Sequence, residues 1–295
     1  MIGRVRVLTW NVAGRVRRLP EQAEVVGALG ADVVALQEIT ARTLPLWREA
    51  LAAGGLAHVA CALEPERARA SAEGEASAPA ARGGRRRLGV LTASREPLER
   101  LPAPGDVPWP ERLLAVRTGG VEIINLHSPI APAPDLAKVR THEAVAAYLA
   151  TNPRSPRVLC GDLNTPRREL PDGDVLTFAH DSAGRLRPER GERWDAAERA
   201  LVHDLRARHG WTDAYRALHG YGERSASWTF KDDRGGWRLD HVLVHGLEPV
   251  ACAYAHEWRR AGLSDHSALV ADLRRSVETG VVQPQAEQLA AQRRA

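Results

Sequence analysis

Gly161-Asp162-Leu163-Asn164 stands directly after the apolar run Arg157-Val158-Leu159-Cys160, and Ser264-Asp265-His266 stands directly before the run Ser267-Ala268-Leu269-Val270. Short apolar runs bounded by polar or glycine residues predict buried strands. Each of these strands would carry a carboxylate, an amide or an imidazole at one end. Ligands of open α/β sheets bind at such strand ends, so the two segments predict a polar site at the edge of a sheet.

Three earlier segments follow the same plan. Apolar runs at 5–10, 32–36 and 121–124 are followed by polar residues, in turn Asn11, Gln37 with Glu38, and Asn125 with His127. The polar strand ends are spread over nearly the whole chain, which predicts one domain whose site closes only when both halves pack together. Strand and helix patterns alternate early and strands cluster later. We therefore expect an α/β sandwich of mixed sheets and not a single parallel sheet.

The predicted domain covers residues 1–275. Within it, 63–86 is rich in alanine, glutamate, serine and arginine and almost lacks large apolar residues, so we expect a flexible insertion loop. This loop is either a basic flap that contacts a phosphate backbone or a neutral insertion. Residues 276–295 are polar and predict a frayed tail. The patterns also predict two helices and a hairpin turn, at 135–152, 194–209 and 118–120.

Composition limits the classes of function. The chain has 295 residues, 44% of them hydrophobic, and a formal net charge of +4, which suits a globular protein and permits a polyanionic partner. All but two of its 41 basic residues are arginine, the exceptions being Lys138 and Lys231. Arginine suits bidentate contacts to phosphate, although codon bias in a GC-rich genome would give the same excess.

Neither a membrane segment nor a disulfide framework is indicated. No apolar stretch approaches the ~20 residues of a transmembrane helix, and Met1-Ile2-Gly3-Arg4 lacks the apolar block of a signal peptide. Cys61, Cys160 and Cys252 show no metal-ligand spacing and no pairing pattern. We expect a monomeric cytoplasmic protein that does not bind a membrane.

Four carboxylates, Glu38, Asp162, Asp240 and Asp265, stand against apolar sequence. Burying a carboxylate is costly unless it is paired or bound to a metal, and four on one wall of a site would require a cation. The donors are oxygens without a Cys/His cluster, which favours Mg²⁺ or Mn²⁺ over Zn²⁺. Any one of these carboxylates, taken alone, could equally be a helix cap or half of an ion pair.

Acid–base chemistry is indicated by two pairs of residues. If the strand of Asp240 neighbours that of His266, the carboxylate can accept a hydrogen bond from the imidazole and favour its protonated form. A protonated His266 beside phosphorus would stabilise the charge of the transition state. Asp162 could take a proton from water while Asn164 holds the reacting phosphate. The alternatives are a structural His–Asp contact and an Asx turn.

Two tryptophans are candidates for substrate contacts. Trp228 lies in Ser227-Trp228-Thr229-Phe230, and Trp237 follows Gly235-Gly236. Glycines before an exposed tryptophan suggest a loop that carries the ring to the rim of a site, where it could stack on a base or fill an abasic gap. An ordinary buried core tryptophan is the alternative.

Together the segments resemble the endonuclease/exonuclease/phosphatase family, the group of DNase I, exonuclease III and the inositol polyphosphate 5-phosphatases. Any one motif is weak, but six in the family's order, over residues 5–273, are highly specific. The motifs are Thr9-Trp10-Asn11-Val12, Leu36-Gln37-Glu38, Asn125-Leu126-His127, Gly161-Asp162-Leu163-Asn164, Arg238-Leu239-Asp240-His241 and Ser264-Asp265-His266.

The resemblance implies a DNase I-like four-layer α/β sandwich, with two central mixed sheets flanked by helices, and divalent-metal-dependent hydrolysis of a phosphoester. It also implies four roles, namely metal binding by Asn11, Glu38 and Asp265, activation or positioning of water by Asp162, contact with the phosphate by Asn164 and His127, and orientation of His266 by Asp240. Water would attack in line while the metal stabilises the developing charge.

Two features of the sequence indicate different subfamilies. The segment 236–240, with Trp228 upstream, is similar to the abasic-site pocket of exonuclease III-type enzymes, which implies substrate contacts from Trp228, Trp237 and Arg238. His127 stands where those enzymes usually carry tyrosine, and histidine there is found in DNase I-like, deadenylase and phosphatase members. We expect hydrolysis of phosphodiesters in nucleic acid, with DNA favoured. The alternatives are a phosphomonoesterase, a small-molecule phosphodiesterase, or a catalytically silent nucleic-acid-binding relative.

Overall fold

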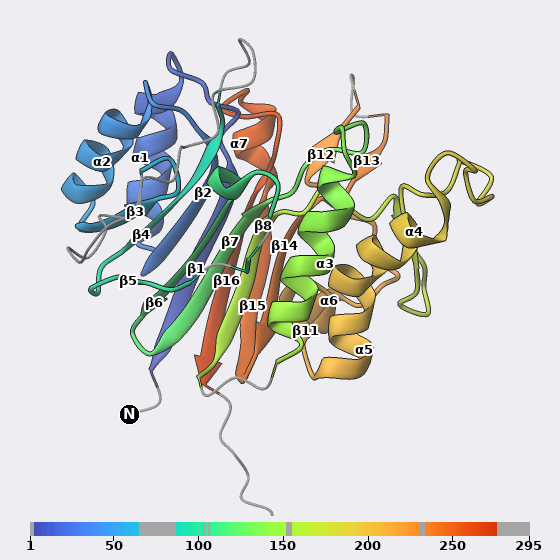
Figure 1. Cartoon of the computed structure of the whole chain (residues 1–295). Coiled ribbons are helices and arrows are strands. Elements are labelled where there is room, and N and C mark those ends of the chain that lie inside the picture. The colour runs from blue at the N-terminus through green and yellow to red at the C-terminus, as the bar shows by residue number, and fades with distance from the viewer. Residues whose placement is uncertain are drawn as a thin grey trace, which may run out of the picture.

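The computed structural model describes most of the chain, namely residues 3–64, 87–102, 104–105, 107–151, 155–230 and 234–275. Two six-stranded sheets lie face to face, and helices cover the outer face of each sheet (Figure 1). The expected four-layer α/β sandwich with two central mixed sheets is therefore confirmed. Of the insertion expected at 63–86 only residues 63 and 64 are described, and the tail expected at 276–295 lies outside the described residues.

Sheet A contains the first and the last strands of the described chain, in the order β15-β16-β1-β2-β4-β3. Its strands are β1 (Arg4–Asn11), β2 (Val33–Ile39), β3 (His58–Cys61), β4 (Gly89–Ser94), β15 (Leu247–Ala255) and β16 (Ala268–Arg275). β1 and β2 are parallel, whereas β16 is antiparallel to β1. The start of β16 therefore lies at the same edge of the sheet as the ends of β1 and β2.

Sheet B has the order β11-β14-β8-β7-β6-β5. Its strands are β5 (Glu99–Arg100), β6 (Leu113–Thr118), β7 (Val121–His127), β8 (Arg157–Asp162), β11 (Thr212–Asp213) and β14 (Asp240–His245). β7 and β8 are parallel and β14 is antiparallel to β8, so Asp162 lies opposite His127 on one side and opposite Asp240 on the other. The hairpin expected at 118–120 joins β6 to β7.

Helices cover both outer faces. α1 (Leu19–Leu29) and α2 (Leu44–Ala53) lie on sheet A, whereas α3 (Ala137–Leu149) and α5 (Leu205–His209) lie on sheet B and α4 (Gly191–Arg199) packs beside α3 (Figure 1). The remaining elements are α6 (Ala214–His219), α7 (His256–Arg260), a 3₁₀ turn (Pro110–Arg112), and two small strand pairs, β9 (Arg168–Glu169) with β10 (Val175–Leu176) and β12 (Trp228–Thr229) with β13 (Gly236–Trp237). No helix among the described residues is long and apolar enough to cross a bilayer.

The two expected helices are present with different boundaries. The helix expected over 135–152 is α3, and Asp135 does not cap it, because Asp135 and Leu136 both have positive φ and the helix begins without a side-chain cap. The helix expected over 194–209 consists of α4, a π-helical segment (Ala200–Asp204) and α5. It ends before Gly210, which has the left-handed φ of 68°, as a C-terminal glycine allows.

Three apolar layers fill the spaces between the elements. Because side chains alternate along a strand, Val7 of β1 packs between the two sheets, whereas Leu8 packs against the helices outside sheet A. In the same way, Ile123 of β7 packs between the two sheets, whereas Ile124 packs in the layer under α3 and α5. The two central sheets are thus held together by fully buried β-branched side chains, which fixes the strand ends relative to one another.

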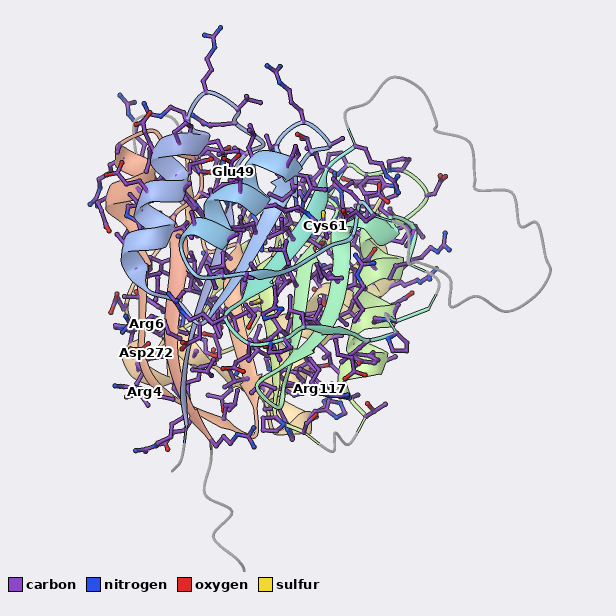
Figure 2. The ribbon with its side chains drawn as sticks, turned by 90° about the vertical axis from the view of Figure 1, so that its left-hand side faces the viewer. Arg4, Arg6, Glu49, Cys61, Arg117 and Asp272 are labelled. Atoms are coloured by element: carbon purple, nitrogen blue, oxygen red, sulfur yellow. The ribbon has the colours of Figure 1, made fainter. Side chains whose placement is uncertain are left out.

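The outer part of sheet A carries an ion pair. Arg6 on β1 and Asp272 on β16 lie side by side (Figure 2), with 2.7 Å between Nε and Oδ1. The arginine side chain is 42% exposed, and an exposed pair of this kind contributes at most about 1 kcal/mol. The pairing of β1 with β16 therefore depends mainly on the hydrogen bonds between their backbones and on the apolar core beneath them.

Candidate active site

The polar strand ends of both sheets meet at one edge of the sandwich. The parallel strands β1 and β2, and β7 and β8, end at this edge. The antiparallel strands β16 and β14 begin at it. The side chains that meet are Asn11, Glu38, His127, Asp162, Asp240 and His266. Residues from both halves of the chain that were expected at one site thus lie close together.

Three residues at these strand ends have a backbone with positive φ. Glu38 has φ 62° and interrupts the pairing of β2 with β4, and Asn164 has φ 51°. Left-handed backbone at a residue other than glycine is costly and is concentrated at functional sites. Gly161 has φ 131°, and a Cβ at this position would lie 2.0 Å from the carbonyl oxygen of Leu126. Only glycine therefore lets β8 approach β7 directly before the site.

Asn11 joins two carboxylates. Its Nδ2 lies 3.3 Å from Glu38 Oε1 and 3.1 Å from Asp162 Oδ2, and its Oδ1 accepts the N–H of Ala13 at 3.0 Å. Ser264 Oγ donates to the carbonyl of Asn11 at 2.6 Å. The end of β1 thus connects a carboxylate of sheet A with one of sheet B and docks the loop that precedes His266.

His266 lies between two aspartates. Its Nδ1 donates to Asp240 Oδ2 at 2.8 Å, and its Nε2 lies 3.8 Å from Asp162 Oδ2. Burial alone would lower the pKa of the imidazole, but Asp240 and then Asp162 raise it to about 10. His266 is therefore protonated at neutral pH. Trp10 Nε1 donates to its carbonyl oxygen at 3.0 Å, which anchors the main chain of His266 to β1.

The pKa values of Asp162 and His127 are shifted in opposite directions, and both shifts favour the uncharged form. Burial raises the pKa of Asp162 to about 7, aided by Asp240 and opposed by His266 and Asn11. Burial also lowers the pKa of His127 well below its ordinary value, with further contributions from Arg112 and His266. At neutral pH His127 is thus a neutral imidazole, and Asp162 is close to its point of half-protonation.

Arg112 is a residue near the site that the sequence analysis did not identify. It ends the 3₁₀ turn at Pro110–Arg112, and its charge acts on the imidazole of His127. The only signal in the sequence is its place directly before the apolar residues 113–116, which lead to the hairpin turn at 118–120. Its position adds a second cation to the edge of the site.

A buried lysine supports Asn164. Lys138 Nζ donates to the carbonyl of Asn164 at 2.7 Å and to Glu198 Oε1 at 2.6 Å, and neither Lys138 nor Glu198 is exposed by more than 1%. Asn164 also donates from Nδ2 to the carbonyl of Ser128 at 2.9 Å, and its N–H donates to Asp162 Oδ1 at 3.0 Å. These contacts hold the Asp-Leu-Asn turn in one conformation. Sequence reasoning missed Lys138, whose rarity was the available signal.

The carboxylates do not form the uniformly buried wall that the sequence suggested. Asp162 and Asp240 are buried, Glu38 is partly exposed, and Asp265 is exposed because it lies on the loop before β16. The buried group of Asp162, Asp240 and His266 has ligand atoms within 4.8 Å of one another, and it could hold a divalent ion if His266 gave up its second proton. The exposure of Asp265 corrects the expectation that it needs a cation for its own burial.

A known protein family has the same pattern of residues. The family described as the endonuclease/exonuclease/phosphatase family matches residues 8–266. The chain belongs to this family. Members of the endonuclease/exonuclease/phosphatase family are hydrolases that act on phosphoester bonds.

Solved structures of this family share the fold. An AP endonuclease from Archaeoglobus fulgidus is 22% identical, with a TM-score of 0.63 over 90% of this chain and 98% of its own. The 3' phosphatase NExo from Neisseria, bound to a product DNA hairpin, is 24% identical, with a TM-score of 0.57 over the same shares. A family protein from Beutenbergia cavernae is 22% identical, with a TM-score of 0.57 over 92% of this chain and 72% of its own. No curated protein matches the sequence.

An aromatic cluster lies beside His266 in this family member. Trp228 and Trp237 stack with ring centroids 5.3 Å apart and planes 10° apart, and Phe178 and Phe230 pack edge-on against Trp237. Trp228 also forms an isolated antiparallel bridge with His266. Both tryptophans are half-buried, so each one packs against other rings and keeps part of its surface open.

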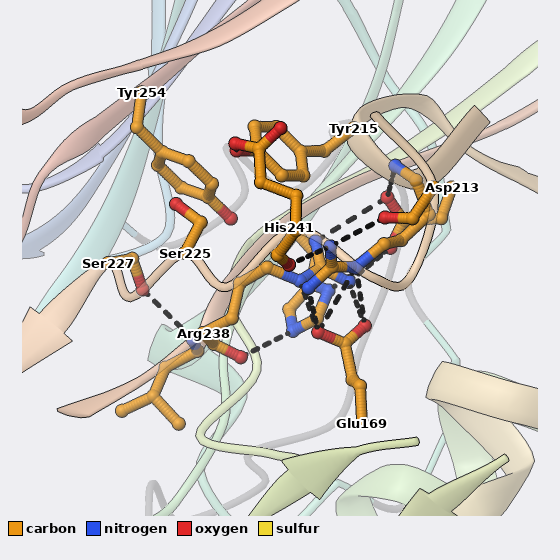
Figure 3. Close-up of polar contacts among 12 residues, drawn as sticks. Glu169, Asp213, Tyr215, Ser225, Ser227, Arg238, His241 and Tyr254 are labelled. Atoms are coloured by element: carbon orange, nitrogen blue, oxygen red, sulfur yellow. Dashed lines mark hydrogen bonds and ion pairs between the residues drawn. The ribbon is translucent and has the colours of Figure 1, made fainter. Parts of the chain in front are cut away.

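Arg238 does not face the site, which corrects the expectation of a substrate contact. Its guanidinium is 3% exposed and pairs with Glu169 at 2.6 Å and with Asp213 at 2.5 Å (Figure 3). Arg216 pairs with the same Glu169 at 2.6 Å. A buried guanidinium held by two carboxylates cannot also reach a phosphate, so Arg238 stabilises the interior next to β14.

A basic groove of about 760 Å³ lies beside the ends of β1 and β2. It is lined by residues 13–18, residues 40–42 and Arg87, and its basic side chains are Arg15, Arg17, Arg18, Arg42 and Arg87. Arg17 and Arg42 are exposed. Positive charge is thus concentrated on the side of the site that carries Asn11 and Glu38.

Proposed function

We propose that this protein hydrolyses phosphodiester bonds in nucleic acid, with DNA favoured, and that it uses Mg²⁺ or Mn²⁺. The proposal is carried by the line of Asp240, His266 and Asp162, with 2.8 Å between the first two and 3.8 Å between the second two. This line sets a carboxylate that can accept a proton next to a protonated imidazole that can stabilise phosphate charge.

The donor set fits a divalent cation. The pKa of Asp162 is raised to about 7, chiefly by burial, and Asp240 Oδ1 is a buried acceptor without a hydrogen-bond partner among the described residues. A nearby cation would relieve both. We assign metal binding to Asn11, Glu38 and Asp265, whose carboxylate and amide oxygens suit Mg²⁺ or Mn²⁺. When bound, the ion would act as a Lewis acid on the phosphate.

Proton transfer is assigned to Asp162. Its carboxylate accepts a proton from water as the water oxygen attacks phosphorus and the bond from phosphorus to the leaving oxygen breaks. His266, protonated and held by Asp240, donates a charged hydrogen bond to the phosphate oxygens as negative charge develops on them.

The phosphate is positioned by neutral groups. His127 carries no charge at neutral pH, because burial and Arg112 lower its pKa, so it contacts the phosphate by a hydrogen bond without adding charge. Asn164 has its main chain fixed by Asp162 and Lys138, and its amide provides a second uncharged contact. Fixed contacts of this kind lower the entropy cost of alignment.

The choice of nucleic acid is supported by surfaces on both sides of the site. The basic groove offers arginines to phosphates that precede or follow the scissile one. Trp228 and Trp237, beside His266, offer partly open aromatic surface to a base. A small phosphate ester would reach neither surface, so extended substrates should gain most from them.

A substrate panel tests the proposal. Duplex DNA, abasic duplex DNA, single-stranded DNA, RNA, DNA with a 3' phosphate and a bis-aryl phosphodiester would each be incubated with Mg²⁺ and with Mn²⁺. We expect metal-dependent cleavage of a nucleic acid phosphodiester, with DNA cut fastest. Release of phosphate alone would replace the proposal with a phosphomonoesterase, and inertness toward the whole panel would leave a binding protein.

Glu38→Ala should raise the Mg²⁺ concentration for half-maximal activity by at least about 10- to 100-fold, because Glu38 is assigned as a ligand and loss of a residue that only supports a ligand already costs that much. Excess Mn²⁺ should restore part of the rate. Glu99→Ala, at an exposed carboxylate on β5 that pairs with Arg117, is the matched control and should leave the metal titration unchanged. Full activity after exhaustive chelation would contradict the assignment.

Arg17→Glu combined with Arg42→Glu should weaken binding of single-stranded DNA and flatten its salt dependence. The slope of log affinity against log salt should fall by about 0.7 for each phosphate that the groove no longer binds. Turnover of the bis-aryl diester should not change, because that substrate does not enter the groove. Arg208→Glu combined with Arg274→Glu, at side chains 71% and 50% exposed, changes the net charge by the same amount and is the control. Equal weakening in the control variant would show that the groove has no special role.

A further inference from the structure

Asp240 and His266 meet across the two sheets. Asp240 begins β14 in sheet B, whereas His266 precedes β16 in sheet A. Their hydrogen bond of 2.8 Å therefore depends on how the edges of the two sheets are joined at the site. Some contact must fix both main chains at once.

Ser227 makes contacts with both main chains. Its Oγ accepts the N–H of Leu239 at 2.9 Å and the N–H of Asp240 at 3.1 Å (Figure 3). Its carbonyl oxygen accepts the N–H of Ser267 at 2.7 Å. Ser227 is 0% exposed, so water does not compete for these bonds. One residue thus holds the start of β14 and the residue that follows His266.

The carboxylate of Asp240 has few contacts of its own. Oδ2 accepts from His266, and Oδ1 has no hydrogen-bond partner among the described residues. The main chain of Asp240 is better fixed, because Tyr254 on β15 donates its hydroxyl to the carbonyl oxygen at 2.6 Å and Ser227 accepts the N–H. The orientation of the Asp240 carboxylate toward the His266 imidazole therefore depends on the position of the Asp240 main chain.

We propose that Ser227 is a positioning residue that holds Asp240 and His266 at hydrogen-bonding distance across the two sheets. This inference rests on the proposed hydrolysis, in which His266 contacts the phosphate. Ser227 itself does not touch substrate. Its hydroxyl uses both acceptor positions on the two N–H groups, so loss of the oxygen frees the start of β14 and lets the carboxylate move away from the imidazole.

Ser227→Ala should lower kcat for the bis-aryl diester by roughly 10- to 100-fold, in line with the cost of a small misalignment, and should leave KM unchanged. Ser227→Thr keeps the hydroxyl and should retain most of the activity. Ser227→Cys keeps the volume with a weak acceptor and should resemble the alanine variant. If the alanine variant does not fold, the comparison of Cys with Thr decides the question.

Ser94→Ala is the matched control. Ser94 is 1% exposed, its Oγ accepts the N–H of Glu96, and that oxygen lies 2.8 Å from Thr118 Oγ1, so it also joins the two sheets, near the start of β2. Its loss should lower the melting temperature without lowering kcat. If Ser227→Ala has the kcat of Ser94→Ala, the inference is wrong.

A second readout does not need activity. The proton on His266 Nδ1, held by Asp240, should give a downfield proton NMR signal in the wild-type protein that weakens or moves in Ser227→Ala and persists in Ser94→Ala. A wild-type protein that is inert toward every substrate, yet shows this change, would refute the proposed function and leave the positioning role standing. An unmoved signal in Ser227→Ala would refute the positioning role.

Discussion

Asp162→Asn is expected to lower kcat by about 10²–10⁴, the contribution of a well-placed general base. The change removes the proton acceptor but keeps the volume of the side chain and an amide oxygen for Asn11. Asp32→Asn is a suitable control, because the carboxylate of Asp32 accepts the N–H of Arg6 at 2.8 Å, at the opposite end of sheet A. Steady-state kinetics on the bis-aryl diester would make the comparison. Near-native turnover of Asp162→Asn would reduce Asp162 to a turn residue.

The same variant has an effect on stability in the metal-free protein. Folding raises the pKa of Asp162 from an ordinary 3.8 to about 7, so the folded state holds this proton more tightly than the unfolded state. The carboxylate therefore costs stability progressively as pH rises from 3.8 through 7. Asp162→Asn, which cannot ionise, should melt at a higher temperature than the wild type at pH 8. This advantage should vanish below pH 4.

His266→Ala is expected to lower kcat by a similar factor of about 10²–10⁴, because it removes the cation that stabilises the phosphate charge. Asp240→Asn should lower kcat by a smaller factor, because it weakens the hydrogen bond that orients the His266 imidazole but leaves the imidazole in place. Asp240 raises the pKa of His266, and with Asp162 brings it to about 10, so Asp240→Asn should also make activity decline at a lower pH. A larger loss for Asp240→Asn than for His266→Ala would contradict the orienting role.

The convergence of the site could be predicted from local sequence. Short apolar runs with polar ends identify strands and the edge at which they stop, and that information places Asn11, Glu38, His127 and Asp162 together. The sequence could not show which sheet each strand joins. The pairing of β14 with β8 and of β16 with β1 depends on packing between residues more than 70 places apart.

The misjudged residues depend on partners that are distant along the chain. Arg238 stood in a motif that suggested a substrate contact, but Glu169 and Asp213 draw its guanidinium into the interior. Lys138 looked like part of an amphipathic helix, and its pairing with Glu198 shows only in the fold. Asp265 was judged by its apolar neighbours, although a loop can expose one residue between two buried ones.

The position of β16 has a consequence for how the protein is made. β16, the last strand described, lies between β15 and β1, the first strand, so sheet A stays incomplete until almost the entire domain has left the ribosome. His266 and its bond to Asp240 are completed at that same late stage. A nascent chain therefore carries the other polar groups of the candidate site before His266 can join them. The order of synthesis would therefore delay the proposed hydrolysis until the segment from β14 to β16, residues 240–275, has left the ribosome.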